Sequence, residues 1–349
     1  METLEPGAGP RTRRLTECPA CRCPADATPL FETADRQHST PGLFQYSLCP
    51  QCRSIYQNPQ VIVDDRDACY PADYYTHTRP AIALTPRRLE RVRERVRSLV
   101  FESHFDRPSA QTWLAGRVLA SIPFVRRRAF FGLMDELIPP RKRGARALDI
   151  GCGSGKLLRA LNQAGWAAEG VDWDPRAAAT AMTYAGCPVQ AGDFCEIPLP
   201  ANAYSMVLMN HVFEHLDDPL RALRRIRELL CIDGRAVLIY PNPAALGAEW
   251  FKKDWFCWEA PRHLVLVHPL EAAELAVRAG LKVVERRTLA RTAAGVSAQS
   301  RAYQRGQIMT TEDLVLDRKD RFFQCREWLQ MLSSPMTGEE VLLVLGRAE

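Results

Sequence analysis

The stretch Arg146–Lys156, RALDIGCGSGK, decides the fold of this chain. It begins as a short, mainly apolar run with one acid, Asp149, which is typical of a buried strand. Glycines then alternate at 151, 153 and 155, and the LLRALNQAGW that follows has the apolar spacing of a helix. Glycines let a backbone approach a ligand closely, and free N–H groups at a helix start attract polar or anionic groups. The stretch therefore predicts a strand, loop and helix that hold a ligand.

Three classes of loop share these features, and two of them do not fit. A Walker-type phosphate loop is excluded, because Lys156 is followed by Leu157 and position 150 is isoleucine instead of glycine. A dinucleotide loop has the pattern G-x-G-x-x-G, whereas the third glycine here arrives one residue early. The remaining pattern is D-x-G-x-G-x-G.

That pattern resembles the first motif of the class I S-adenosylmethionine-dependent methyltransferases, and the resemblance covers roughly residues 145–349. It implies an α/β fold with a Rossmann-like seven-stranded sheet, helices on both faces, and S-adenosylmethionine as cofactor. Asp172 would accept the ribose hydroxyls, while Asp193 and Phe194 would contact the adenine, since an ionised carboxylate only accepts hydrogen bonds. The cofactor-binding residues that the resemblance implies are Asp149, Gly151, Cys152, Gly153, Gly155, Asp172, Trp173, Asp193, Phe194 and Asn210.

The segment HVFEHL, residues 211–216, has the H-x-x-E-H spacing of one class of zinc peptidases. It comes directly after the buried-strand run YSMVLMN, and a helix start with Pro219 follows a few residues later. A peptidase needs these residues on a sustained helix, so we expect a strand-to-helix crossover instead. The resemblance places this crossover beside the methyl donor and its acceptor.

Methyl transfer from a sulfonium needs an aligned acceptor and, for a hydroxyl, removal of a proton. Histidine has the right pKa range for that proton. We expect His215 to be the base, with His211 and Glu214 shaping the pocket and His263 as a second candidate base. The alternative is that some of these side chains only bind backbone groups.

The N-terminal segment contains two CxxC pairs, Cys18/Cys21 and Cys49/Cys52, which predict a tetrahedral site for structural Zn²⁺. A site of four thiolates has no open position, so we expect it to stabilise a small module and not to catalyse. The crowded CxxCxC sequence leaves Cys23 as a competing ligand. The order of these motifs along the chain is similar to bacterial methyltransferases with an N-terminal zinc-binding segment, a group associated with small molecules such as sugars and secondary metabolites.

We expect three regions: a zinc-binding module at 1–75, a helical linker or cap at 76–140, and the methyltransferase domain at 141–349. An amphipathic, arginine-rich helix is predicted near 89–100 and a second one over roughly 111–137. The arginines suggest nucleic acid, but we favour a solvated helix face beside Glu90, Glu94 and Glu102. Residues 291–337 are long and polar enough to be a lid.

Three tryptophans, Trp250, Trp255 and Trp258, fall within nine residues after the next strand, RAVLIYPN. They could form a substrate wall or pack a connecting loop onto the core. The segment LEAAELAVRAGLKVVERRTLA predicts a helix and then a strand, and GEEVLLVLGR predicts a closing strand.

The 349 residues, 46% of them hydrophobic, are enough to bury a large core, and no run is long and apolar enough to span a membrane. The scattered cysteines and the absence of a signal-like start predict a cytoplasmic protein. The net charge of +5 does not demand a polyanionic partner. We expect a small-molecule acceptor methylated on oxygen or carbon; the alternatives are an RNA methyltransferase and a non-catalytic donor-binding protein. The oligomeric state leaves no mark in the sequence.

Overall fold

The structure is a computed structural model. It describes residues 9–24, 28–71, 110–122, 144–163, 165–307 and 315–348, together with positions 92, 95, 96, 99, 100 and 125. The chain divides into two compact units. Unit 1 comprises Met1–Tyr74, Met209–Glu228 and Ala236–Glu349, and unit 2 comprises Tyr75–Leu208 and Leu229–Arg235.

The largest sheet has seven strands, in the order β12-β13-β10-β9-β6-β7-β8. The bounds of these strands are β6 (Arg146–Ile150), β7 (Ala167–Asp172), β8 (Val189–Ala191), β9 (Tyr204–Asn210), β10 (Leu230–Pro241), β12 (Leu281–Leu289) and β13 (Glu340–Arg347). The predicted seven-stranded α/β fold is confirmed.

In unit 2, β6, β7 and β8 pair in parallel. They are connected by α4 (Lys156–Gln163) and α5 (Pro175–Ala185), because parallel neighbours need a crossover. Helix α5 begins at Asp174, whose carboxylate accepts the N–H of Arg176, and ends at Gly186, which has the left-handed φ of 67° common at helix ends. These crossovers place Ile150 and Asp172, the last residues of β6 and β7, at the same edge of the sheet.

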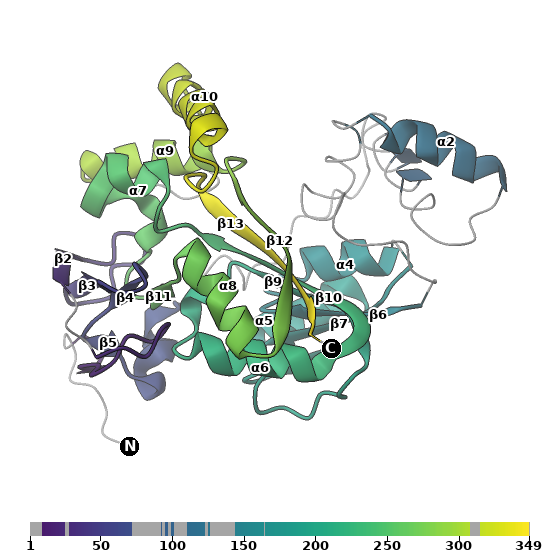
Figure 1. The fold of residues 1–349 in the computed structure, drawn as a ribbon, viewed down its shortest axis with the longest axis horizontal. Coiled ribbons are helices and arrows are strands. Elements are labelled where there is room, and N and C mark those ends of the chain that lie inside the picture. Colours follow the sequence, from purple (N-terminus) through teal and green to yellow (C-terminus); the bar gives the residue numbers. More distant parts are fainter. Residues whose placement is uncertain are drawn as a thin grey trace. The chain divides into compact units, whose positions relative to one another are not determined.

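In unit 1, β13 pairs antiparallel with both β10 and β12 (Figure 1). All residues of β13 except Arg347 are buried, which explains its continuous apolar sequence. The strand predicted from GEEVLLVLGR is therefore confirmed at this central position.

A second sheet in unit 1 has the order β11-β4-β3-β2. The bounds of its strands are β2 (Thr28–Thr33), β3 (Phe44–Leu48), β4 (Ile55–Gln57) and β11 (Val265–Leu266); β1 (Thr12–Arg13) and β5 (Gln60–Val61) form a separate pair, and the turn η1 (Val63–Cys69) follows. Strand β11 comes from far along the chain, yet it pairs with β4 through Tyr56 and Val265. The small N-terminal sheet therefore includes a strand from the segment that carries His263.

The other helices of unit 1 surround these sheets. Their bounds are α6 (Pro219–Leu229), α7 (Leu246–Phe251), α8 (Pro269–Arg278), α9 (Ala293–Gln304) and α10 (Arg318–Ser333), with short turns η2 (Phe213–His215), η3 (Lys252–Asp254) and η4 (Phe256–Trp258). Helix α9 packs against α7, η4 and α10 (Figure 1). Trp255 and Trp258 are buried in the hydrophobic core of this region, so packing, and not a substrate wall, explains these two tryptophans; Trp250 is about half exposed.

The predicted linker lies mostly outside the described residues. Its second helix is α2 (Ala110–Ala120), which ends in a turn at Ser121 and Ile122. The prediction of one helix to residue 137 was wrong at this point, because Pro123 disfavours helical geometry at the residue before it. The three-region division and a lid at 291–337 stay predictions, although α9 within that range is largely buried. No described helix is long and apolar enough to cross a membrane.

Candidate functional site

The glycine loop of unit 2 joins β6 to α4. Its three glycines, Gly151, Gly153 and Gly155, have φ values of 68°, 50° and 79°, which glycine adopts without a steric cost. The loop is held to the end of β7, because the N–H groups of Gly151 and Cys152 donate to the carbonyl of Val171 at 2.8 and 3.1 Å. The loop geometry is thus fixed by backbone hydrogen bonds.

Asp172, the last residue of β7, is buried and turned toward this loop. One carboxylate oxygen accepts the N–H of Gly153 at 2.8 Å, and the other accepts the N–H of Asp174 at 3.0 Å. The neighbouring Trp173 is 41% exposed. Loop and carboxylate are therefore held as one group, with an exposed aromatic ring next to it in the sequence.

Asp149 lies within β6 and is almost fully buried. Burial, together with repulsion from the nearby negative charge of Asp172, raises the pKa of Asp149 to about 8. Below that pH, Asp149 is predominantly protonated and can donate a hydrogen bond.

Asp193 and Phe194 follow β8, in a turn. The Asp193 carboxylate accepts the N–H of Cys195 at 2.9 Å, and Phe194 is buried. Asn210 ends β9 in unit 1, and its side-chain oxygen Oδ1 accepts a hydrogen bond from the guanidinium group of Arg291 at 3.5 Å. The donor-binding roles of these three residues stay predictions.

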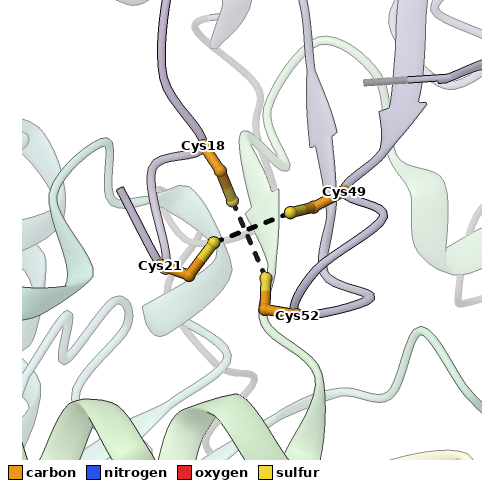
Figure 2. Close-up of side chains that lie close together, drawn as sticks. All are labelled: Cys18, Cys21, Cys49 and Cys52. Atoms are coloured by element: carbon orange, nitrogen blue, oxygen red, sulfur yellow. Dashed lines mark hydrogen bonds between the residues drawn. The ribbon is translucent and has the colours of Figure 1, made fainter. Parts of the chain in front are cut away.

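The predicted metal-binding cysteines converge in unit 1 (Figure 2). The Sγ atoms of Cys18 and Cys52 are 3.8 Å apart, and those of Cys21 and Cys49 are 3.6 Å apart. In a tetrahedral zinc site with Zn–S bonds of about 2.3 Å, the sulfur atoms are separated by about 3.8 Å. The four thiols therefore fit a Zn²⁺ ion.

The backbone at the two cysteine pairs has matching geometry. Arg22 and Arg53, directly after the second cysteine of each pair, have φ values of 65° and 63°. Their N–H groups donate to the carbonyls of Cys18 and Cys49 at 2.9 and 3.0 Å. Cys23 remains a competitor, because its Sγ lies 3.4 Å from that of Cys49.

The segment HVFEHL forms a crossover between β9 and α6, as predicted, with only the short turn η2 inside it. His211 has a φ of 55°, and its two ring nitrogens lie 3.3 Å from a Glu214 oxygen and 2.8 Å from a Glu340 oxygen. Burial by itself lowers the pKa of His211, but the hydrogen bonds to Glu214 and Glu340 outweigh burial and raise this pKa to about 10. His211 is therefore cationic at neutral pH, in an ion-paired role that suits shaping the pocket and not binding a metal.

His215 and His263 face each other edge to face, with ring centroids 4.7 Å apart. The Nδ1 atom of His215 lies 3.0 Å from the carbonyl oxygen of Arg262 and 3.1 Å from the hydroxyl of Tyr70. The Nδ1 atom of His263 lies 2.7 Å from the carbonyl oxygen of Cys257. Burial and the charge of His263 lower the pKa of His215 to about 4, so the His215 ring is neutral at pH 7. The contacts with backbone that we considered do exist, but they occupy only Nδ1.

The histidine pair is held in place by the N-terminal sheet. The guanidinium group of Arg262 is fully buried and donates to both carboxylate oxygens of Asp35, at 2.8 and 3.0 Å. The hydroxyl of Tyr46 donates to the carbonyl of His263 at 2.9 Å. The residue before His263 and the backbone of His263 itself are thus held by the N-terminal segment.

Sequence reasoning missed three residues at this cluster. Tyr70 contacts His215, and Glu340, at the start of the predicted closing strand, contacts His211. Glu259 has a carboxylate oxygen 3.5 Å from Nε2 of His263. The i, i+4 spacing of Glu259 and His263 in the sequence is a signal that could have identified this pair.

Comparison with protein families now adds to this geometry. Residues 124–286 match the model of a methyltransferase domain family. Residues 124–286 therefore form a methyltransferase domain, and the glycine loop and seven-stranded sheet are those of the class I S-adenosylmethionine-dependent type. The resemblance inferred from the glycine loop is confirmed, and the match includes both the donor loop and the histidine pair.

Curated relatives of this methyltransferase domain include two ubiquinone biosynthesis O-methyltransferases of Cereibacter sphaeroides. That of strain KD131 is 33% identical over 156 residues, which are 41% of this chain and 63% of the relative. That of strain ATCC 17025 is 32% identical over 157 residues, which are 42% of this chain and 63% of the relative. The chain thus spans less than two thirds of the length of these relatives.

Solved structures with a similar fold include a phosphoethanolamine N-methyltransferase 2 of Haemonchus contortus in complex with S-adenosyl-L-methionine. It is 16% identical with a TM-score of 0.46, and the match covers 84% of this chain and 63% of that one. A methyltransferase of Archaeoglobus fulgidus is 19% identical with a TM-score of 0.42, over 67% of this chain and 99% of that one. At these values, neither structure carries an argument about substrate.

Proposed function

We propose that this protein transfers the methyl group of S-adenosylmethionine to a small molecule, on a hydroxyl oxygen or a carbon. The observation that carries this proposal is the joined loop and carboxylate of unit 2, in which Gly153 donates to Asp172 at 2.8 Å. In this reaction the acceptor atom bonds to the methyl carbon, the carbon–sulfur bond breaks, and its electron pair stays on sulfur in S-adenosylhomocysteine.

The donor half of the proposal assigns the sugar of the cofactor to Asp172 and the adenine to Asp193 and Phe194. The backbone of the loop already positions the Asp172 carboxylate, so little ordering is lost when the donor binds. The free N–H groups at the start of α4 add a favourable electrostatic environment for the carboxylate of the donor.

The acceptor half assigns proton removal to His215, with His263 as a second base. The ring of His215 is neutral at pH 7, and its Nδ1 is occupied by the Arg262 carbonyl, which leaves Nε2 to accept the proton. The curated relatives are named as O-methyltransferases, which supports a hydroxyl acceptor.

Calorimetry with S-adenosylhomocysteine tests the donor half. Asp172→Asn removes the charge that accepts two N–H groups, and we expect affinity to fall on the order of tenfold or more. Asp174→Asn is the matched control, because asparagine caps α5 as well as aspartate does. Equal affinities of wild type and Asp172→Asn would contradict this assignment.

Turnover tests the acceptor half. Labelled donor is incubated with fractionated small-molecule extracts or with RNA, and we expect label only in the small-molecule fractions. His215→Ala should lower the rate on the acceptor by roughly 10² to 10⁴ while donor binding persists. Label in RNA would support the alternative substrate, and donor binding without release of S-adenosylhomocysteine would support a donor-binding protein.

We also propose that Cys18, Cys21, Cys49 and Cys52 hold a structural Zn²⁺ ion. Support comes from the sulfur separations, which suit tetrahedral zinc. We expect Cys21→Ser to lose the ion and Cys23→Ser to retain it, as measured by elemental analysis after desalting. The reverse result would make Cys23 the ligand.

A further inference from the structure

Three potential metal ligands converge in unit 1, away from the four cysteines. Glu214 and His215 come from η2, and His263 comes from the segment before β11. One ligand atom from each side chain lies within 4.8 Å of the others. Nε2 of His263 is 3.8 Å from a Glu214 oxygen.

The backbone fixes the tautomer of both histidines. A carbonyl oxygen can only accept, so the Nδ1 atoms of His215 and His263, at 3.0 and 2.7 Å from carbonyl oxygens, each carry a hydrogen. In the neutral form of each ring, the lone pair is then on Nε2. Histidines that bind metals usually donate their other N–H to a carbonyl or carboxylate in this way.

Glu214 supplies a buried carboxylate whose charge is only partly matched. Its side chain is fully buried, and one oxygen is shared between His211 at 3.3 Å and His263. The other oxygen, Oε2, has no hydrogen-bond partner among the described residues. A buried carboxylate oxygen without a partner is costly, and a cation beside it would remove that cost.

We propose that Glu214, His215 and His263 bind one divalent transition-metal ion, such as Zn²⁺ or Fe²⁺. Two imidazoles and one carboxylate form the ligand set that these ions accept, and three protein ligands leave positions open for another oxygen. A carboxylate oxygen of Glu259 lies 3.5 Å from Nε2 of His263, so Glu259 is near enough to be a fourth protein ligand or to hydrogen-bond to water on the ion.

This ligand set differs from the peptidase reading of H-x-x-E-H. His211, the first histidine of that motif, has both ring nitrogens at carboxylates, with Glu340 at 2.8 Å. The second imidazole comes instead from His263, 48 positions after His215 in the sequence. Only the fold brings these two rings together.

The role of the ion rests on the proposed function, whereas its binding does not. An acceptor hydroxyl bound to the ion would have a lowered pKa and would give its proton to solvent water. The resulting oxygen bonds to the methyl carbon, the carbon–sulfur bond breaks, and its electron pair remains on sulfur. When the ion is bound, it replaces His215 in the proton removal that the proposed function assigns to that residue, and the two imidazoles hold the metal.

The metal content of the full chain tests the site. Protein is stripped with a chelator, reloaded with Zn²⁺, desalted and analysed for metal per chain. We expect two ions in the wild type, one at the cysteines and one here, and a single ion in Glu214→Gln and in His263→Gln. His268→Asn is the control: it removes an imidazole that only caps α8, replaces it with another capping residue, and should retain two ions.

Cobalt separates the two sites by colour and guards against misfolded variants. Co²⁺ added to wild type that holds a single Zn²⁺ ion, at the cysteines, should give weak visible bands without the intense near-ultraviolet sulfur-to-cobalt band, because its ligands are nitrogen and oxygen. Retention of the cysteine-bound ion and of S-adenosylhomocysteine binding shows that each variant is folded. A wild type with one ion, or variants that keep two, would overturn the site. Binding of the second ion with no effect on turnover would leave the site intact and reject its catalytic role.

Discussion

Several carboxylates of this chain are buried, and their neighbours decide whether each is charged. Glu340 is ion-paired with Arg291 and His211. Burial by itself raises the pKa of Glu340, but these two partners lower it to about 2. No cation among the described residues pairs with Glu327 or Glu339; burial and repulsion among nearby carboxylates raise the pKa of both side chains. At neutral pH Glu340 is therefore ionised, whereas at least one of Glu327 and Glu339 is protonated.

The raised pKa of Glu327 predicts a pH dependence of stability. Between the unfolded pKa near 4.5 and the higher folded value, the folded state holds more protons, so stability falls as pH rises through this window. Glu327→Gln removes this loss. We expect the free energy of unfolding of the variant, relative to wild type, to be higher at pH 9 than at pH 5 by on the order of 2 kcal/mol. Urea unfolding at the two pH values measures it, with the exposed Glu274→Gln as control. A parallel pH profile for wild type and Glu327→Gln would contradict the prediction.

At the scale of elements, the contact between α4 and α5 depends on one glycine of the donor loop. A Cβ atom at Gly155 would lie 2.9 Å from the Cα of Ala181 in α5, closer than such atoms approach. Gly186, which ends α5, also has a positive φ, but a Cβ there would meet nothing within 4 Å. The two glycines therefore separate the cost of backbone conformation from the cost of helix packing.

We expect Gly186→Ala to cost about 1 kcal/mol, because alanine is strained in the left-handed region. Gly155→Ala should cost clearly more, about 3 kcal/mol, since backbone atoms of α5 must also move. Urea unfolding compares the two, and calorimetry with S-adenosylhomocysteine shows whether the loop is displaced. Equal losses of stability would mean that α5 adjusts freely.

At the scale of the whole molecule, the N-terminal segment and the segment around His263 are one structure within unit 1. Strand β11 pairs with β4, and Arg262 forms a fully buried ion pair with Asp35. Although burial alone raises it, the guanidinium group holds the pKa of Asp35 well below its ordinary range. The charged pair thus connects residues 227 positions apart, next to a candidate catalytic histidine.

Asp35→Asn should destabilise the protein by about 3 kcal/mol, because Arg262 loses a buried counter-charge, although its ion pair with Glu259 remains. Asp65→Asn in the same segment is the matched control, since its partner Arg11 is half exposed, and we expect a smaller loss. Thermal unfolding measures both. We also expect Asp35→Asn to lower turnover more than donor affinity, since it acts near His263; a loss confined to donor affinity would contradict this placement.

The sequence by itself determined the strands and helices of the α/β sheet and the donor loop. YSMVLMN is β9 with the same ends as expected, and RALDI is β6, because local apolar periodicity and glycine conformation depend on neighbours in the chain. The two cysteine pairs were predicted as a metal site for the same reason, since each pair is a local motif.

Only the tertiary structure decided which side chains meet. In the fold, His215 and not His211 faces His263, with Tyr70 in contact with His215 and Asp35 in contact with Arg262. Trp255 and Trp258 are buried in the core. It also added β11 to the N-terminal sheet. These contacts join residues far apart in sequence, and pKa values depend on burial and on charges supplied by distant segments, so no local pattern encodes them.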